Sequence, residues 1–295
     1  MDKKFRSGYA AIIGRPNVGK STLLNTILGQ KVSIVTTKPQ TTRNRIIGIK
    51  TEKDAQIIFI DTPGIHRPKT RIGELMVREA RESLKEVDIV LFMTGPHPPT
   101  PKEEEILKTL SHVKKPVILL INKIDIVRKS KLLPVMDEYS RLFPFKEMIP
   151  VSALKGEGVD ALLKTILEYL PEGPKYYPDE LVTDQLERFM VSEIIREKVM
   201  EAAEEEVPHA AAVEIVGWEE REGGPVHISA NIWVEREGQK RIIIGKSGRK
   251  MKEIGQAARA DIEGLLGSRV FLELWVKVKK GWRSDIRAIR DLGME

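Results

Sequence analysis

Residues 14–21 read Gly14-Arg15-Pro16-Asn17-Val18-Gly19-Lys20-Ser21. They fit the G-x-x-x-x-G-K-[ST] pattern of a P-loop, and they lie between an apolar run that ends at Ile13 and a helical pattern that begins near Ser21. In this motif the curled backbone presents N–H groups to phosphates, the lysine neutralises β/γ charge, and the hydroxyl ligates Mg²⁺. A chance match in a chain this long has odds of about one in a hundred. The stretch therefore predicts a nucleotide site.

The sequence around the P-loop alternates short apolar runs with amphipathic segments. This alternation predicts an α/β domain with a mostly parallel sheet flanked by helices. We expect strands at 9–13, 56–60, 87–93, 117–121 and 148–151, and helices at 22–28, 73–85 and 159–170.

Three further motifs follow predicted strands in order. They are Asp61-Thr62-Pro63-Gly64 with Ile65 behind it, then Asn122-Lys123-Ile124-Asp125, then Ser152-Ala153-Leu154. A carboxylate at Asp61 can reach Mg²⁺ through water, and the Gly64 amide can reach a γ-phosphate. Together with Lys20, these positions are the predicted catalytic groups.

Asp125 identifies the base. Its carboxylate can accept hydrogen bonds from guanine N1–H and from the exocyclic amine, whereas adenine offers neither donor there. Two such bonds, at about 1.5–3 kcal/mol each, predict a preference for guanine of about 10²–10⁴. We therefore expect GTP and GDP rather than ATP, with Ser152, Ala153 and Leu154 supporting the base.

The order of elements changes after a stretch at 171–178 that contains three prolines. We expect a helix at 181–206, strands at 211–219 and 226–235, helices within 241–266, and a strand at 270–278. This gives a second, smaller α+β domain. The predicted organisation is a nucleotide-binding domain at 1–172, a linker at 173–180 and a second domain at 181–295.

A basic turn marks this second domain. It reads Ile244-Gly245-Lys246-Ser247-Gly248-Arg249-Lys250. Residues 240–290 carry 14 Lys and Arg against 5 Asp and Glu, in a chain of net charge +6. A G-x-x-G turn between helices allows close approach of a sugar-phosphate backbone, and its basic side chains can meet phosphates. We predict that these seven residues bind RNA. A second G-x-x-G, from Gly264 to Gly267, is apolar, and we expect no such role for it.

The four motifs, in this order, resemble those of the GTPase superfamily, and the P-loop wording together with Pro39-Gln40-Thr41-Thr42-Arg43 resembles its Era family. The α-β-β-α-α-β order resembles a type II KH domain. The resemblance implies a first switch at 36–44, with Thr42 favoured over Thr41 as a ligand of Mg²⁺ beside Ser21 and Asp61 and as a fourth catalytic residue. It also implies a target, the 3′ end of 16S rRNA during 30S subunit assembly. Related GTPases suggest a K⁺ ion near Asn17.

Composition limits the other functions. The 295 residues include no cysteine, which excludes disulfides and thiolate metal sites, and the five histidines show no paired ligand spacing. With no apolar stretch long enough for a signal peptide or a membrane-spanning helix, we expect a cytoplasmic protein.

We also expect a monomer that binds no DNA, with peripheral contact at the inner face of the cell membrane as a further expectation. The alternatives are a signalling or membrane-associated GTPase whose second domain binds protein or lipid, and a constitutive RNA binder with a structural nucleotide.

Overall fold

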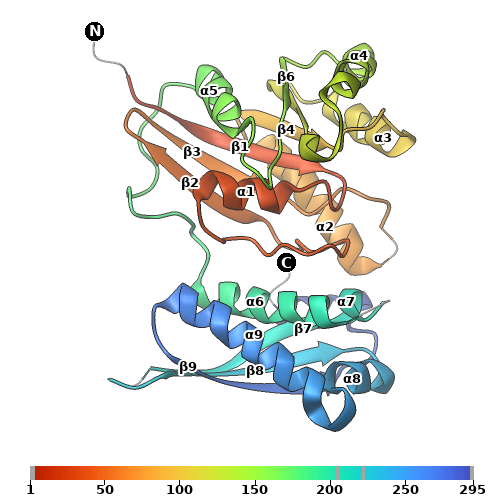
Figure 1. Cartoon of the computed structure of the whole chain (residues 1–295), viewed down its shortest axis with the longest axis vertical. Helices are drawn as coiled ribbons and strands as arrows, with labels where there is room; N and C mark the ends of the chain where they lie inside the picture. The colour runs from red at the N-terminus through yellow and green to blue at the C-terminus, as the bar shows by residue number, and fades with distance from the viewer. Residues whose placement is uncertain (1–3, 69, 204–205, 221–222, 293–295) are drawn as a thin grey trace. The chain divides into compact units, whose positions relative to one another are not determined.

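The computed structural model describes residues 4–68, 70–203, 206–220 and 223–292. The chain divides into two compact units (Figure 1). The first comprises 4–33, 42–68 and 73–184. The second comprises 185–292 together with 34–41 and 70–72.

The first unit is built on a six-stranded sheet in the order β2-β3-β1-β4-β5-β6. Only the β2–β3 pair is antiparallel. The strands are β1 (Arg6–Gly14), β2 (Ile46–Glu52), β3 (Ala55–Asp61), β4 (Ile89–Thr94), β5 (Val117–Ile121) and β6 (Glu147–Pro150). The helices are α1 (Lys20–Leu28), α2 (Arg71–Glu82), α3 (Pro101–Leu110), α4 (Leu132–Leu142) and α5 (Val159–Tyr169).

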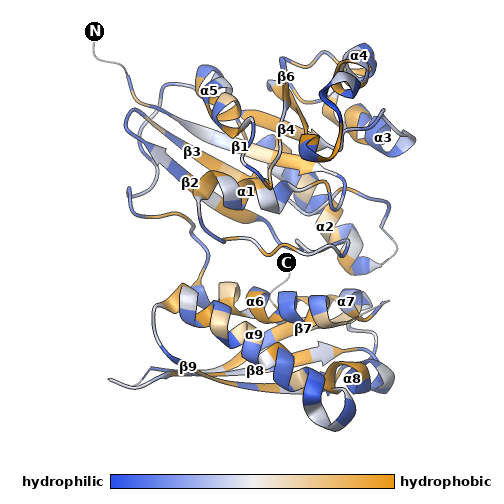
Figure 2. Cartoon of the chain, in the orientation of Figure 1, coloured by the Kyte–Doolittle hydropathy of each residue, from blue (hydrophilic) through white to orange (hydrophobic). Residues whose placement is uncertain are grey.

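The central strands are buried on both faces, which explains their continuous apolar sequences. Every residue of β3, β4 and β5 is buried, and Figure 2 shows hydrophobic colour over β3 and β4. Strands covered on both sides read as runs of Val, Ile and Leu rather than as alternation. The predicted α/β class is confirmed, with β1 at the centre of the sheet and the P-loop at its carboxyl end.

Strand β2 is absent from the strands predicted from the sequence. Its second half, Lys50-Thr51-Glu52, is only partly covered, and Gly48 interrupts its apolar run. Gly48 is needed because a Cβ there would lie 2.6 Å from a methyl carbon of Leu24 in α1. An edge strand with a polar end and a central glycine gives a weak sequence signal.

The second unit packs helices on one face of a three-stranded sheet. The sheet order is β7-β8-β9, with β7–β8 antiparallel and β8–β9 parallel. Its core joins Val191 and Ile195 of α6, Ile254 and Ile262 of α9, and the inward side chains of the sheet. The elements are α6 (Glu187–Ala202), α7 (Val207–Ala210), β7 (Ala212–Glu219), β8 (Val226–Val234), α8 (Glu237–Ile244), α9 (Arg249–Leu266), β9 (Val270–Val278) and α10 (Ile286–Asp291).

Three helix boundaries differ from the prediction. The helix expected from 181 begins at Glu187, because residues 181–184 have no regular secondary structure and Val182 O accepts a hydrogen bond from Ile49 N of β2. The helix ends at Ala202 rather than at Glu206, because Ala203 adopts an extended backbone, with φ of −102° and ψ of 153°. The helix expected from 241 begins earlier, at Glu237, because Gln239 Oε1 accepts from the backbone N–H groups of Glu235 and Arg236 and so caps it.

Candidate functional site

The P-loop joins β1 to α1 in the predicted geometry. Gly19 adopts a left-handed backbone, with φ of 105°, and α1 begins at Lys20. The Lys20 side chain is buried, and its Nζ donates to Gly14 O at 3.5 Å and to Arg15 O at 3.2 Å. The loop thus holds its lysine inside the curl where phosphates would lie.

The three predicted metal-site residues converge beside this lysine. Ser21 Oγ donates to Asp61 Oδ2 at 2.6 Å, and Ser21 Oγ lies 2.9 Å from Thr42 Oγ1. Asp61 is fully buried, and its other oxygen, Oδ1, has no hydrogen-bond partner among the described residues. Two hydroxyls and a buried carboxylate with one unused oxygen are a donor set that fits Mg²⁺.

Burial and charge oppose each other at this cluster. Burial lowers the pKa of Lys20, and the nearby Asp61 acts in the other direction. Burial raises the pKa of Asp61, while Lys20 and hydrogen bonds from Ser21, Ser33 and Thr42 lower it. Burial disfavours both the Lys20 ammonium and the Asp61 carboxylate. A bound phosphate would stabilise the charge of Lys20, and a bound cation would stabilise the charge of Asp61.

The structure separates the two candidate threonines. Thr42 Oγ1 lies at the cluster of Ser21 and Asp61. Thr41 Oγ1 instead donates to Lys38 O at 2.7 Å and lies 2.8 Å from Thr36 Oγ1. The side chain of Thr41 therefore closes a local turn.

Gly64 lies against the P-loop. Ile65 N donates to Gly14 O at 3.1 Å, and a Cβ on Gly64 would lie only 2.6 Å from Pro16 N. Thr62 Oγ1 donates to Ile12 O at 2.8 Å, which fixes the 61–64 segment to β1. The Ile65 side chain packs against the core of the unit.

Asn122 connects the loops of the predicted base site. Its Nδ2 donates to Val18 O at 2.7 Å, and its Oδ1 accepts from Ala153 N at 2.9 Å. Lys123 adopts a left-handed backbone and its Nζ donates to Asn17 O at 3.0 Å. One asparagine thus joins the P-loop, the 122–125 segment and the 152–154 segment.

Asp125 is the exposed end of this arrangement. Ser152 Oγ donates to Asp125 Oδ1 at 2.7 Å, and this bond, with smaller contributions from Lys155 and Lys123, holds the pKa of Asp125 below its ordinary value. Asp125 is therefore ionised and free to accept further hydrogen bonds. Ile124 is buried in the core, whereas Leu154 is 78% exposed.

Two residues that were not predicted, Ser33 and Glu103, support the nucleotide site. Ser33 Oγ donates to Asp61 Oδ2 at 3.0 Å, and Glu103 Oε1 accepts from Arg15 Nη1 at 2.9 Å. Glu103 is almost fully buried and also caps α3 through Thr100. A Thr-Pro-x-Glu pattern at a helix start was visible in the sequence as a capping signal, but its bond to the P-loop was not.

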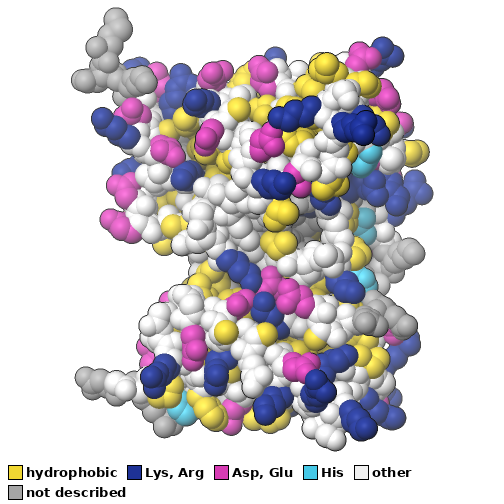
Figure 3. Space-filling model, in the orientation of Figure 1, with side chains coloured by type: hydrophobic (Ala, Val, Ile, Leu, Met, Phe, Trp, Pro, Cys, Tyr) yellow, Lys and Arg dark blue, Asp and Glu magenta, His cyan; other side chains and the backbone are white. Residues whose placement is uncertain are grey.

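The basic turn of the second unit lies between α8 and α9, as predicted. Gly245 has φ 73° and ψ 179°, and Gly248 has φ 75° and ψ 7°. Lys246, Ser247 and Arg249 are exposed, while Ile244 and Lys250 are half-buried. The second G-x-x-G forms the end of α9, with Gly267 as its cap. Figure 3 shows many Lys and Arg side chains over α8 and α9.

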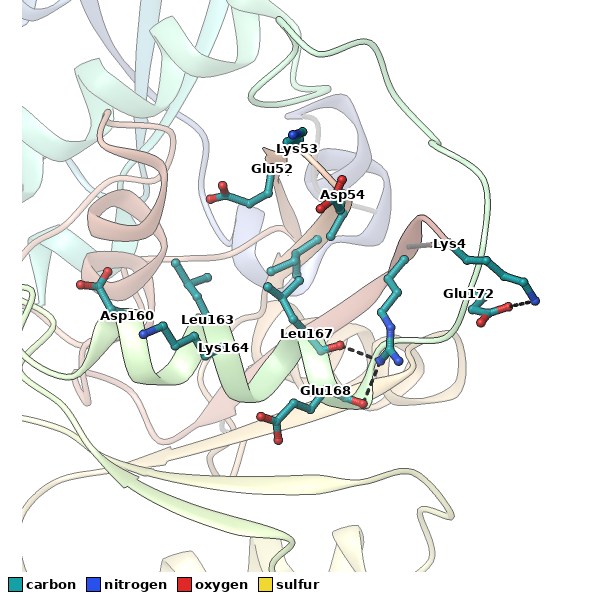
Figure 4. Close-up of a pocket in the computed structure, with 13 residues that line it drawn as sticks. Lys4, Glu52, Lys53, Asp54, Asp160, Leu163, Lys164, Leu167, Glu168 and Glu172 are labelled. Atoms are coloured by element: carbon teal, nitrogen blue, oxygen red, sulfur yellow. Dashed lines mark hydrogen bonds and ion pairs between the residues drawn. The ribbon is translucent and has the colours of Figure 1, made fainter. Parts of the chain in front are cut away.

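A cavity of about 840 Å³ in the first unit lies away from these sites (Figure 4). It is lined by the start of β1, the β2–β3 turn and α5, at the amino ends of β1 and β3, whereas the P-loop follows the carboxyl end of β1. Lys4 and Glu172 form an ion pair of 2.8 Å at its rim. None of the predicted site residues lines it.

Comparisons with known proteins agree with this geometry. A family model described as a 50S ribosome-binding GTPase matches residues 9–123, and a KH domain model matches residues 206–283. The GTPase Era of Ruminiclostridium cellulolyticum is 50% identical over 290 residues, which is 98% of this chain and 97% of that protein. The chain belongs to the Era family of GTPases.

Solved Era structures match the whole chain. A crystal structure of Era in complex with MgGDPNP and nucleotides 1506–1542 of 16S ribosomal RNA is 46% identical, covers 98% of this chain and 99% of that one, and has a TM-score of 0.96. An Aquifex aeolicus Era variant bound to GDP·AlF4⁻ is also 46% identical, with the same coverage and a TM-score of 0.95. This Era family member is thus a GTP-binding enzyme that hydrolyses GTP, with a P-loop GTPase domain followed by a KH domain. The predicted family, fold and activity are confirmed. No helix in the described part of the chain is long and apolar enough to cross a membrane.

Proposed function

We propose that this GTPase is an RNA-binding switch that holds the 3′ end of 16S rRNA and acts in maturation of the 30S subunit. The G-x-x-G turn carries the proposal, because its two glycines leave the backbone open and Lys246 and Arg249 are exposed beside it. The Era relative crystallised with 16S rRNA nucleotides supports the choice of target. The alternative is a domain that binds protein or lipid, and the G-x-x-G turn does not favour it.

In the first unit we assign the nucleotide as follows. The P-loop amides and Lys20 hold the β- and γ-phosphates, and Asp125 with Ala153 N holds guanine. Ser21, Thr42 and, through water, Asp61 would hold Mg²⁺, which neutralises charge that develops on the γ-phosphate. The Gly64 amide would donate to the γ-phosphate. Because Ile65 cannot hydrogen-bond a nucleophilic water, we expect slow turnover in the absence of a partner.

A K⁺ ion near Asn17 is part of the proposal. Asn17 has φ of 63°, and its carbonyl is held by Lys123 Nζ. A monovalent cation there would replace part of the charge of an arginine finger. Faster turnover in KCl than in NaCl supports this site, and equal rates argue against it.

Residues 36–41 of the first switch belong to the second unit, where they and Val35 lie against α6. Arg196, which is 2% exposed, donates through Nη2 to Thr41 O, and Glu197 Oε1 accepts from Val35 N at 2.9 Å. Because Thr42 follows Thr41 directly, ordering of Thr42 around Mg²⁺ and the γ-phosphate would bear on these contacts. We propose this as the route by which GTP changes RNA binding.

The proposal implies a cytoplasmic, monomeric protein that binds no DNA. Peripheral contact with the inner face of the membrane fits the basic residues Lys279 and Lys280 that follow β9. Salt-sensitive binding to anionic liposomes without RNA affinity would favour the alternative function.

GTP turnover, with and without a single-stranded oligonucleotide from the 3′ end of 16S rRNA, tests the main proposal. The variant is Gly248→Asp, since nothing lies within 4 Å of a Cβ at this left-handed position and aspartate tolerates that conformation. The matched control is Gly267→Asp, another left-handed glycine with open space. RNA binding that Gly248→Asp abolishes and Gly267→Asp retains supports the proposal. No binding by the wild type overturns it.

A further inference from the structure

A groove of about 840 Å³ runs beside the G-x-x-G turn in the second unit. Gly248, α9 and β9 line it, with an apolar floor that includes Ile244, Met251 and Leu274. Its basic residues are Lys240, Lys252, Arg259 and Lys277, and none of the described residues that line it is acidic. The groove therefore has the charge and the apolar surface that a single strand of nucleic acid needs.

Strand β9 forms one wall of the groove and the edge of the sheet. Val270 and Val276 face the core, whereas Phe271 and Trp275 alternate with them and point to the opposite face of the sheet. Phe271 is 51% exposed and Trp275 is 45% exposed, yet both line the groove. Two large rings thus stand at the edge strand, about 13 Å apart along it.

Trp275 differs from the other three tryptophans. The indole N–H of Trp282 donates to Ala210 O, that of Trp233 to Glu214, and that of Trp218 to Glu220. The indole N–H of Trp275 has no hydrogen-bond partner within the described ranges, and its ring is exposed. Packing accounts for the other three tryptophans and leaves Trp275 without a structural role.

Glu273 lies between the two rings in sequence, and a carboxylate there could repel phosphates. Its side chain accepts a hydrogen bond from Ser229 Oγ at 3.2 Å, which directs it toward β8 and away from the open edge. The Phe271 ring is supported on the same side by His227, with ring centroids 5.0 Å apart. Phe271 and Trp275 therefore border the groove at the edge strand from the outer face of the sheet, and the Glu273 carboxylate between them is held toward β8.

We propose that Trp275 and Phe271 form a stacking surface for unpaired RNA bases next to those held by the G-x-x-G turn. The turn grips about four nucleotides. The strand then continues along the groove, past Lys277, and further bases stack on the two rings. The surface lengthens the bound RNA and adds affinity that does not depend on sequence, because every base has a π-face. The inference rests on the proposed function.

An extended peptide that paired with the free edge of β9 would be the competing occupant. Continuity with the G-x-x-G turn and the basic groove favours RNA, since a peptide backbone gains nothing from four cations. The experiment treats the peptide as the alternative outcome.

Binding of two labelled RNAs to the full chain tests the proposal by fluorescence anisotropy. One RNA has about four nucleotides and the other about twelve, both from the 3′ end of 16S rRNA. Trp275→Ala should weaken binding of the longer RNA by about 5- to 100-fold and leave the shorter RNA nearly unchanged. Trp275→Phe should restore most of the affinity, because it keeps a ring. Trp218→Phe, on β7 and outside the groove lining, is the matched control.

A base analogue gives a second readout. Emission of 2-aminopurine placed outside the four gripped positions should be quenched by the wild type and by Trp275→Phe, but not by Trp275→Ala. Equal affinity of the wild type and Trp275→Ala for the longer RNA, while Gly248→Asp still abolishes binding, overturns the stacking surface alone and leaves the edge for a peptide. Absence of RNA binding by the wild type overturns the proposed function and this inference together. Circular dichroism of each variant establishes that it folds.

Discussion

Asp125 depends on one neighbour for its ionisation. The Ser152 hydrogen bond holds the pKa of Asp125 down, and guanine recognition needs the carboxylate. Binding is therefore present above the Asp125 pKa and lost as the pH falls through it. In Ser152→Ala the pKa rises toward its ordinary value of about 3.9. We expect nucleotide affinity to fall at a higher pH than in the wild type.

The measurement is the dissociation constant of a fluorescent GDP analogue across a pH series between neutrality and about pH 3. Ser140→Ala, which removes an exposed hydroxyl that donates to Asp137 O within α4, is the control. The same pH midpoint in Ser152→Ala and in the wild type would contradict the role given to Ser152.

Gly64 has no room for a side chain. A Cβ there would lie 2.6 Å from Pro16 N and 2.8 Å from Pro16 Cα, and neither atom can move without shifting the P-loop. We expect Gly64→Ala to displace the amide proposed to meet the γ-phosphate and to lower GTP turnover by roughly tenfold or more. Gly238→Ala, in α8 with nothing within 4 Å, should turn over GTP at the wild-type rate. Single-turnover hydrolysis measures both, and an unchanged rate in Gly64→Ala would refute the assignment.

At the scale of elements, α6 carries charged residues in its buried face. Arg196 pairs with Glu193, its side chain is buried, and it also donates to Met200 Sδ and to Thr41 O. Arg196→Met leaves Glu193 and the Thr41 carbonyl without this partner. We expect it to lower the free energy of unfolding of the second unit by about 3–5 kcal/mol.

Urea unfolding followed by tryptophan fluorescence measures this change, because all four tryptophans lie in the second unit. Arg188→Met, on the exposed side of the same helix and 5.8 Å from the Trp218 ring, should cost less than about 1 kcal/mol. If the two variants unfold at the same urea concentration, Arg196 is not a buried anchor.

The elements differed in how well the sequence predicted them. The P-loop, the strand before it and the helix after it were predicted because glycine spacing and apolar runs act locally. Arg196 and Glu197 could not be predicted as buried, since charged residues are ordinarily exposed and their partners are 155 and 162 residues away along the chain. Trp275 was one of four similar tryptophans until the sheet register showed which face it occupies.

For the whole molecule, the order of two domains was visible in the change of element order after residue 171. The path of the connecting segment could not be predicted from the sequence, because prolines signal a break in regular structure but do not show where the chain then lies. In the structure, Gln56 Oε1 accepts from the backbone N–H groups of Tyr176 and Tyr177, and Ser7 Oγ donates to Pro174 O.

This segment also covers the outer side of β2. Ile49 N donates to Val182 O, and Thr183 Oγ1 donates to Ile47 O. An uncovered edge strand offers its backbone groups to strands of other molecules, which promotes aggregation. The segment thus protects the edge of β2 from pairing with other molecules and also connects the two domains. An isolated GTPase domain cut at residue 172 should aggregate on concentration, whereas one extended to Asp184 should stay monomeric in light scattering.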